Sequence, residues 1–210
     1  VSPFNIMAVT FTNKASYEMK ERIENLIGLN GRSVLISTFH SMCAQFLRNE
    51  AKNIGLHPNF SICDSQDQKN IIKQCIKQLN LDEKKFVPQV VSSIISRAKD
   101  DMVGVEEFRQ EANKKMNDFH PVVADIYEMY QKILQSSQNL DFGDLVYKTV
   151  EMFQTHKDIL ERYQERFKYV MVDEFQDTNE SQYLLIKFLS GKHKNICVVG
   201  DDDQSIYSWR

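Results

Sequence analysis

Four short apolar runs restrict the fold of this chain more than any other feature of its sequence. They lie at residues 6–11, 33–37, 169–172 and 196–199. Apolar runs of this length, bounded by polar residues or glycine, are typical of strands buried on both faces of a parallel sheet. Amphipathic helical patterns at residues 15–27 and 42–54 follow the first two runs. The sequence therefore predicts an α/β domain in which crossover helices connect parallel strands.

The middle of the chain has a different pattern. Between about residues 65 and 137 no stretch resembles a strand, and three apolar stripes recur at helical spacing, over residues 71–79, 90–98 and 122–134. Ser65 with Gln68 resembles a capping box in front of the first stripe. The pattern predicts an all-helical subdomain of at least three helices.

The helical block divides the chain into three predicted segments. Residues 1–62 and 140–210 form the two parts of the α/β domain, and residues 63–139 form the inserted helical subdomain. Polar stretches at residues 82–85 and 99–101 fall between the apolar stripes, and we expect them to be solvated turns.

Composition sets only broad limits on the function. The 210 residues carry a net charge of −3, so the overall charge does not indicate a nucleic-acid partner. A local groove can still be basic. The longest uninterrupted apolar runs have four residues, whereas a membrane helix needs about twenty. The four cysteines have no metal-ligand spacing, which favours a reduced, cytosolic setting.

An acidic pair follows the third apolar run. Asp173 and Glu174 come directly after residues 169–172, and ligands of parallel sheets gather beyond the carboxyl ends of strands. Mg²⁺ prefers oxygen ligands and needs only one or two carboxylates, so Asp173 is the predicted metal ligand. Glu174 is the predicted base, which orients or deprotonates a water that attacks a phosphate. The alternative is a pair of acids that merely favours the start of a helix.

Five segments together resemble the UvrD/PcrA/Rep family of superfamily 1 DNA helicases. In chain order they are residues 10–15 (TFTNKA), 37–41 (STFHS), 140–145 (LDFGDL), 173–179 (DEFQDTN) and 198–210 (VVGDDDQSIYSWR). They follow the order of the family's motifs and span almost the whole chain. The resemblance implies a partial RecA-like motor domain, with a parallel sheet and flanking helices, interrupted by the all-helical insertion.

The resemblance also implies ATP and Mg²⁺ as cofactors and assigns roles to three residues. Asp173 carries over as the magnesium carboxylate, Glu174 as the general base, and Gln204 as a sensor of the γ-phosphate. A glutamine amide suits this last role because it can contact a phosphate oxygen without adding charge. Taken alone, Gln204 would equally suit a polar turn.

Single-stranded DNA and junctions of single- and double-stranded DNA are the implied partners. Aromatic rings grip single strands by stacking on bases, and the resemblance nominates Phe11, Phe142, Tyr207 and Trp209. Further contacts to the DNA backbone are expected from Thr12, Asn13, Thr38, His40 and Arg210. Most aromatic side chains of a globular protein lie in its core, and a structural role for His40 remains open.

The chain also departs from the family pattern. Ser208 stands where the family often has arginine, Gly143 where a second acid is common, and Ser16 where alanine is frequent. A larger departure is that no Gly-Lys-Ser or Gly-Lys-Thr run is present, although such a loop holds the ATP phosphates. We therefore expect a piece of a longer motor that is inactive by itself. The complete protein is expected to be a 3′–5′ helicase in repair or replication, in the bacterial cytoplasm near the nucleoid.

Two rival functions remain open. The chain can be a non-catalytic DNA- or protein-binding module derived from a helicase, which the missing phosphate loop favours. It can also be a nuclease that holds two metal ions with carboxylates from Asp173, Glu174, Asp177, Asp201, Asp202 and Asp203.

Overall fold

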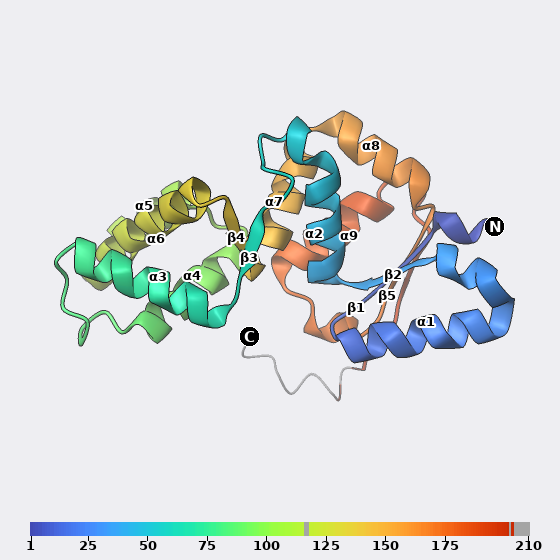
Figure 1. Ribbon diagram of the computed structural model, residues 1–210, viewed down its shortest axis with the longest axis horizontal. Coiled ribbons are helices and arrows are strands. Elements are labelled where there is room, and N and C mark those ends of the chain that lie inside the picture. The colour runs from blue at the N-terminus through green and yellow to red at the C-terminus, as the bar shows by residue number, and fades with distance from the viewer. Residues whose placement is uncertain (116–117, 202, 204–210) are drawn as a thin grey trace. The chain divides into compact units, whose positions relative to one another are not determined.

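The computed structural model describes residues 1–115, 118–201 and 203, which form two compact units (Figure 1). Unit 1 contains residues 1–46 and the chain from Lys148 onward, and unit 2 contains residues 47–147. Helices α2 (Phe39–Glu50) and α7 (Phe142–Thr155) both run across this division. The three segments drawn from the sequence, with boundaries at residues 62/63 and 139/140, stay a prediction.

Unit 1 is built on a four-stranded sheet. In spatial order its strands are β2 (Leu35–Thr38), β1 (Ile6–Thr10), β5 (Tyr169–Val172) and β6 (Ile196–Val198). Every neighbouring pair is parallel. All four predicted strands are present, and the predicted fold class, a parallel α/β sheet with flanking helices, is confirmed.

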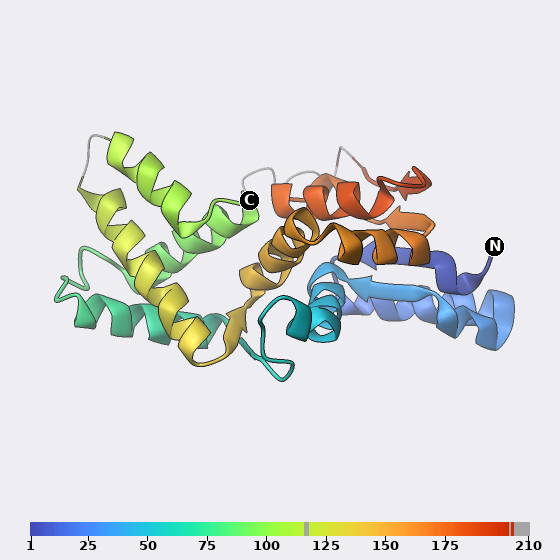
Figure 2. The same ribbon diagram turned by 90° about the horizontal axis from the view of Figure 1, so that it is seen from above.

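Helices flank the sheet of unit 1. Besides α2 and α7 they are α1 (Asn13–Ile27), α8 (Lys157–Arg166) and α9 (Glu180–Ser190), with 3-10 turns at Pro3–Asn5, Gly28–Ser33 and Phe175–Asp177. Helix α1 lies on one side of the sheet and α8 on the other (Figures 1 and 2). Aromatic rings join α2, α7 and α8, since Phe46 lies 4.3 Å from Tyr163 and 6.3 Å from Phe153 between ring centroids.

Helix α1 packs on the sheet over only part of its length. Met19 and Ile23 contact the sheet residues Ala8 and Ile36, as the predicted apolar face requires. Leu26 belongs to the same apolar face by its helical spacing but is 81% exposed. The reason is geometric, because fifteen helical residues span about 22 Å whereas the five residues of β1 span about 16 Å. The last turn of the helix therefore extends beyond the sheet.

Unit 2 is mainly helical. Its elements are α3 (Ser65–Gln78), α4 (Pro88–Asp100), α5 (Val105–Lys114) and α6 (Phe119–Ser136), a 3-10 turn at Ala51–Asn53, and two parallel strands, β3 (Ser61–Cys63) and β4 (Asn139–Asp141). One continuous apolar core joins α3, α4, α5 and α6. The predicted block of at least three helices is therefore confirmed. Neither α5 nor the small sheet was predicted, because both lie outside the three apolar stripes.

Two local expectations in unit 2 were wrong. The capping box of α3 is formed by Asp64 and Asp67, not by Ser65 and Gln68, and the Asp64 carboxylate accepts the Asp67 N–H at 2.8 Å. Lys99, expected in a solvated turn, lies in α4 with its side chain 1% exposed.

Among the helices that the structure describes, none combines the length and the apolar character that crossing a membrane requires.

Candidate functional site

The four strands of unit 1 end at one edge of the sheet. Val9 of β1 is in register with Val172 of β5, and Val172 is in register with Val198 of β6. The Asp173 N–H donates to the Val9 carbonyl at 3.0 Å, and the Val199 N–H donates to the Val172 carbonyl at 2.8 Å. Asp173 therefore leaves the sheet at its centre, between the ends of β1 and β6, where a parallel sheet presents ligand-binding groups.

Asp173 and Glu174 form a sharp turn after β5. The Asp173 Oδ1 atom accepts the Glu174 N–H at 3.0 Å, and Glu174 has the left-handed backbone angles φ 52° and ψ 41°. This conformation costs a non-glycine residue about 1–3 kcal/mol, and strain of this kind clusters at functional sites. The Phe175 N–H donates to the Val199 carbonyl at 2.9 Å and ties the turn to the end of β6. The turn that carries these two half-buried acidic residues is thus held by backbone contacts on both sides.

Gln176 connects the turn after β5 with the segment after β6. Its Oε1 atom accepts the Asp201 N–H at 3.1 Å. Gly200 lies against the same atom, because a Cβ added to Gly200 would be 2.9 Å from the Gln176 Oε1 atom. We did not predict a role for Gln176. The only signal was its place inside the segment of residues 173–179, since nothing in its chemistry distinguishes it from a surface glutamine.

The three residues after β1 differ in burial and in the contacts that they make. The Phe11 ring is half-buried and lies 5.3 Å from the Phe39 ring between centroids. Thr12 is the N-cap of α1, where its hydroxyl accepts the Ala15 N–H at 3.1 Å. Asn13 is exposed at the first position of the helix. Of these three predicted DNA contacts, Thr12 therefore also stabilises the start of α1.

The end of β2 and the start of α2 are more buried. The Thr38 Oγ1 atom donates to the Ser41 Oγ atom at 3.0 Å and accepts the Ser41 N–H at 3.3 Å, so Thr38 starts α2 as Thr12 starts α1. Burial lowers the pKa of His40, which favours its neutral form. Thr10, paired with Thr38 in the sheet, is fully buried, and its hydroxyl has no hydrogen-bond partner in the described structure. Phe11, His40, Asp173 and Glu174 thus lie shortly after three strands that are neighbours in the sheet, and Thr38 is the last residue of one of these strands.

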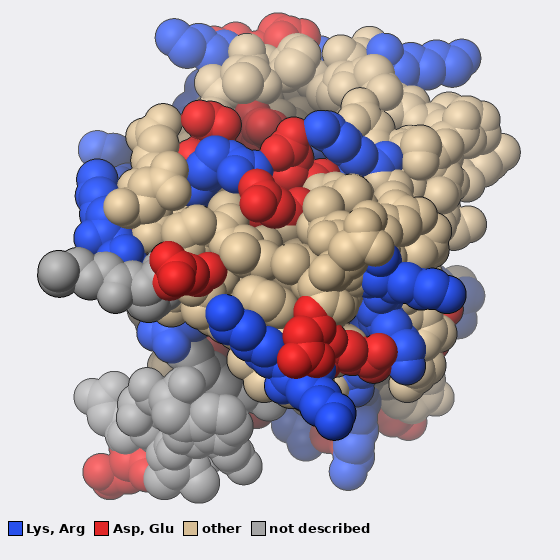
Figure 3. Space-filling model, turned by 90° about the vertical axis from the view of Figure 1, so that its left-hand side faces the viewer, with Lys and Arg blue, Asp and Glu red and all other residues tan. Residues whose placement is uncertain are grey.

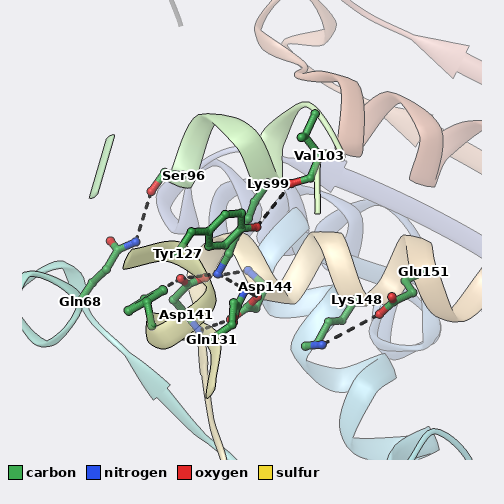
Figure 4. A network of polar contacts seen from close by, with 11 residues as sticks. Gln68, Ser96, Lys99, Val103, Tyr127, Gln131, Asp141, Asp144, Lys148 and Glu151 are labelled. Atoms are coloured by element: carbon green, nitrogen blue, oxygen red, sulfur yellow. Dashed lines mark hydrogen bonds and ion pairs between the residues drawn. The ribbon is translucent and has the colours of Figure 1, made fainter. Parts of the chain in front are cut away.

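Phe142, the remaining predicted aromatic contact, belongs to unit 2. It is the first residue of α7, and 48% of it is exposed. Asp141 and Asp144 flank it, and both of their carboxylates pair with Lys99 (Figure 4). The sequence identified the segment of residues 140–145 but did not predict this partner.

The predicted sensor Gln204 and the predicted DNA contacts Tyr207, Trp209 and Arg210 lie outside the described residues.

The donor chemistry of the strand end fits a hard cation. Asp173 uses Oδ1 to accept one backbone N–H, and its second carboxylate oxygen makes no hydrogen bond or ion pair within the described structure. Mg²⁺ requires only one or two carboxylates because it retains most of its waters. Among the residues that the structure describes, no three His, Cys, Asp or Glu side chains are grouped to hold a metal ion. The Asp173 carboxylate supplies an oxygen ligand of the kind that Mg²⁺ requires.

Charged side chains of both signs are mixed on the surface of unit 2. Arg109 contacts Asp125 and Glu128 at 2.6 Å each, and Lys73 contacts Glu83 at 3.0 Å. Figure 3 shows basic and acidic side chains interspersed on the visible face of the molecule. On this face, charge alone does not mark a nucleic-acid site.

Comparison with known proteins identifies the family. A family model described as the UvrD/REP helicase N-terminal domain matches residues 1–210. The ATP-dependent DNA helicase PcrA of Bacillus subtilis is 49% identical over 210 residues, and that of Staphylococcus epidermidis is 48% identical over 211 residues. Each match covers 100% of this chain and 28% of the relative, so the chain spans little more than a quarter of those proteins. The chain belongs to the family of the UvrD/REP helicases, within the N-terminal domain of that family.

Proposed function

We propose that this chain forms part of the motor of an ATP-dependent DNA helicase. The observation that carries the proposal is the position of Asp173 and Glu174 at the carboxyl edge of the sheet, immediately after the inner strand β5. Because the chain covers 28% of its relatives, helicase activity is proposed for a longer protein that contains it. That protein moves 3′ to 5′ on single-stranded DNA and unwinds duplexes in repair or replication.

The chemistry assigned to the site is ATP hydrolysis. Asp173 would hold Mg²⁺, which, when bound, neutralises charge on the phosphates. Glu174 orients a water toward the γ-phosphate and accepts its proton. The left-handed turn and the hydrogen bond from the Phe175 N–H fix Glu174 relative to β6, so little reorganisation is needed during the reaction. Gln204 senses the γ-phosphate, and Gln176 holds the start of the segment that carries Gln204.

Single-stranded DNA is the proposed substrate along which the motor moves. Its bases stack on aromatic rings, and the rings assigned to this task are Phe11, Phe142, Tyr207 and Trp209. Exposed and half-buried positions suit stacking, and Phe142 is 48% exposed. The contacts to the DNA backbone are assigned to Thr12, Asn13, Thr38, His40 and Arg210.

The 210 residues alone are proposed to be inactive. They contain no Gly-Lys-Ser or Gly-Lys-Thr run, and phosphoryl transfer in this class depends on that phosphate-binding loop. Adding ATP and single-stranded DNA to the isolated chain should therefore release no phosphate above background.

The proposal is tested by Glu174→Gln in the complete protein. Replacing the base with an amide of the same shape should lower DNA-stimulated ATP hydrolysis by roughly 10²- to 10⁴-fold and leave nucleotide binding intact. Glu180→Gln is the matched control, because Glu180 is an exposed residue of the neighbouring helix α9. A wild-type protein without DNA-stimulated hydrolysis would contradict the motor function and favour the binding module derived from a helicase.

A further inference from the structure

A buried lysine joins two carboxylates inside unit 2. The Lys99 Nζ atom lies 2.6 Å from the Asp141 Oδ2 atom and 2.9 Å from the Asp144 Oδ1 atom. All three side chains are at most 4% exposed. Lys99 comes from α4, whereas the two acids bracket the start of α7, so this cluster connects segments that are 42 residues apart. Figure 4 shows the lysine pointing between the two acids.

The two acids also hold the first turn of α7 directly. The Asp144 N–H donates to the Asp141 Oδ1 atom at 2.8 Å, and the Asp141 N–H donates to the Asp144 Oδ2 atom at 3.2 Å. Donors from α6 complete the cluster: the Tyr130 hydroxyl reaches Asp141 at 2.7 Å, and the Gln131 amide reaches Asp144 at 3.1 Å. Each carboxylate is therefore surrounded by donors from three parts of unit 2.

Phe142 lies on the turn that this cluster holds. It follows Asp141 directly and is 48% exposed, although its neighbours Asp141 and Asp144 are buried. Gly143 lies against the stem of the lysine, because an added Cβ would be 3.0 Å from the Lys99 Cδ atom. A side chain at this position would require the stem of Lys99 to shift by a few tenths of an ångström.

We infer that Lys99 is a positioning residue for DNA binding, which locks the first turn of α7 and thereby presents the Phe142 ring to a base. The inference rests on the proposed function of Phe142. A buried ion cluster is seldom the most stabilising solution, since well-packed apolar side chains of similar size often serve stability as well or better. What the cluster does provide is a single geometry for the exposed ring between its two acids. If the ring-presenting geometry is populated for only a fraction of the time, the apparent affinity for DNA is the intrinsic affinity multiplied by that fraction.

The test is a double-mutant cycle on the complete protein, read as the affinity for a fluorescein-labelled oligo(dT) strand. Phe142→Ala should weaken binding roughly 5- to 150-fold, the range for the loss of one base–aromatic stack. Lys99→Met should weaken binding by about threefold or more in the presence of Phe142, but by less than about 1.5-fold in the Phe142→Ala background. A residue that acts only on stability would have the same effect in both backgrounds.

Two further variants keep the test decisive if Lys99→Met folds poorly. Tyr130→Phe removes one hydrogen bond to Asp141 and keeps the ring, so it should show the same dependence on Phe142 with a smaller effect. Val91→Ala is the matched control, because Val91 is fully buried in α4 and belongs to the apolar core. It should lower the thermal midpoint without changing the affinity for oligo(dT).

The outcomes separate the two proposals. If Phe142→Ala leaves the affinity unchanged, the DNA-binding function of Phe142 fails and the function of Lys99 fails with it. If Phe142→Ala weakens binding but Lys99→Met and Tyr130→Phe act equally in both backgrounds, only the positioning function of Lys99 is overturned.

Discussion

The side chain of Gln176 holds the backbone of Asp201: the Asp201 N–H donates to the Gln176 Oε1 atom at 3.1 Å. This hydrogen bond links the turn that contains Asp173 and Glu174 with the segment that follows β6. Together with the Phe175 N–H, which donates to the Val199 carbonyl, this hydrogen bond is expected to transmit a change in one segment to the other.

Gln176→Ala should lower DNA-stimulated ATP hydrolysis roughly 2- to 12-fold, which corresponds to the net worth of one hydrogen bond. Gly200→Ala should also lower it, because the new Cβ would be 2.9 Å from the Gln176 Oε1 atom. The effect of Gly200→Ala should shrink in the Gln176→Ala background, since the clash is gone. Gln66→Ala, which removes an exposed hydrogen bond to Asn70 in α3, is the control. Additive effects of the two variants would refute the link.

Glu174→Gly should separate backbone strain from chemistry. Glycine adopts φ 52° without a penalty, so the free energy of unfolding should rise by about 1 kcal/mol while ATP hydrolysis falls roughly 100-fold or more. Lys194→Gly, at φ 54°, should give a similar gain in stability with hydrolysis unchanged. Thermal unfolding and phosphate release measure the two effects. A loss of stability in Glu174→Gly would mean that side-chain contacts, rather than function, retain the strained turn.

Asp173→Asn should raise the Mg²⁺ concentration required for half-maximal hydrolysis by roughly tenfold or more. The amide keeps an oxygen for the Glu174 N–H but removes the charge that the cation needs. Asp177→Asn provides the comparison, because Asp177 is exposed in the same loop. The measurement is a Mg²⁺ titration of phosphate release at constant ATP. An unchanged requirement for Mg²⁺ in Asp173→Asn would show that another residue holds the cation.

Stability should decline above pH 9, in part because of Cys43. Burial raises the pKa of this thiol from 9.0 to about 12, so above pH 9 the unfolded chain loses a proton that the folded chain keeps. Stability from this group is complete below pH 9 and is lost as the pH rises toward 12, by up to about 1.4 kcal/mol per pH unit. The difference in thermal midpoint between wild type and Cys43→Ala should therefore change between pH 9 and 11. Cys197→Ala, at an exposed thiol, should follow the wild type throughout.

The strand pattern and the position of the acidic pair could be predicted because both depend on local sequence. An apolar run such as residues 169–172 is buried in whatever sheet it joins, and the residue after it must emerge at the sheet edge. Likewise, the apolar stripes of residues 71–79 and 122–134 required helices with one buried face.

Long-range contacts could not be predicted in the same way. Lys99 stands among polar residues and resembles a surface lysine, yet it is buried by two acids that lie more than 40 residues further along the chain. Leu26 resembles a core residue, yet it is exposed because the helix is longer than the strand it covers. In both cases the local pattern is ordinary, and the outcome depends on which other segment comes close.

The sequence alone thus determined the α/β class, the inserted helical block, the family resemblance and the place of Asp173 and Glu174 at the end of a strand. The tertiary structure decided the strand order, the left-handed backbone of Glu174, the contact between Gln176 and Asp201, and the burial of Lys99 beside Phe142. The division has a physical cause. Hydrophobic periodicity acts within one segment, whereas register, strain and buried ion pairs arise only when distant segments pack against one another.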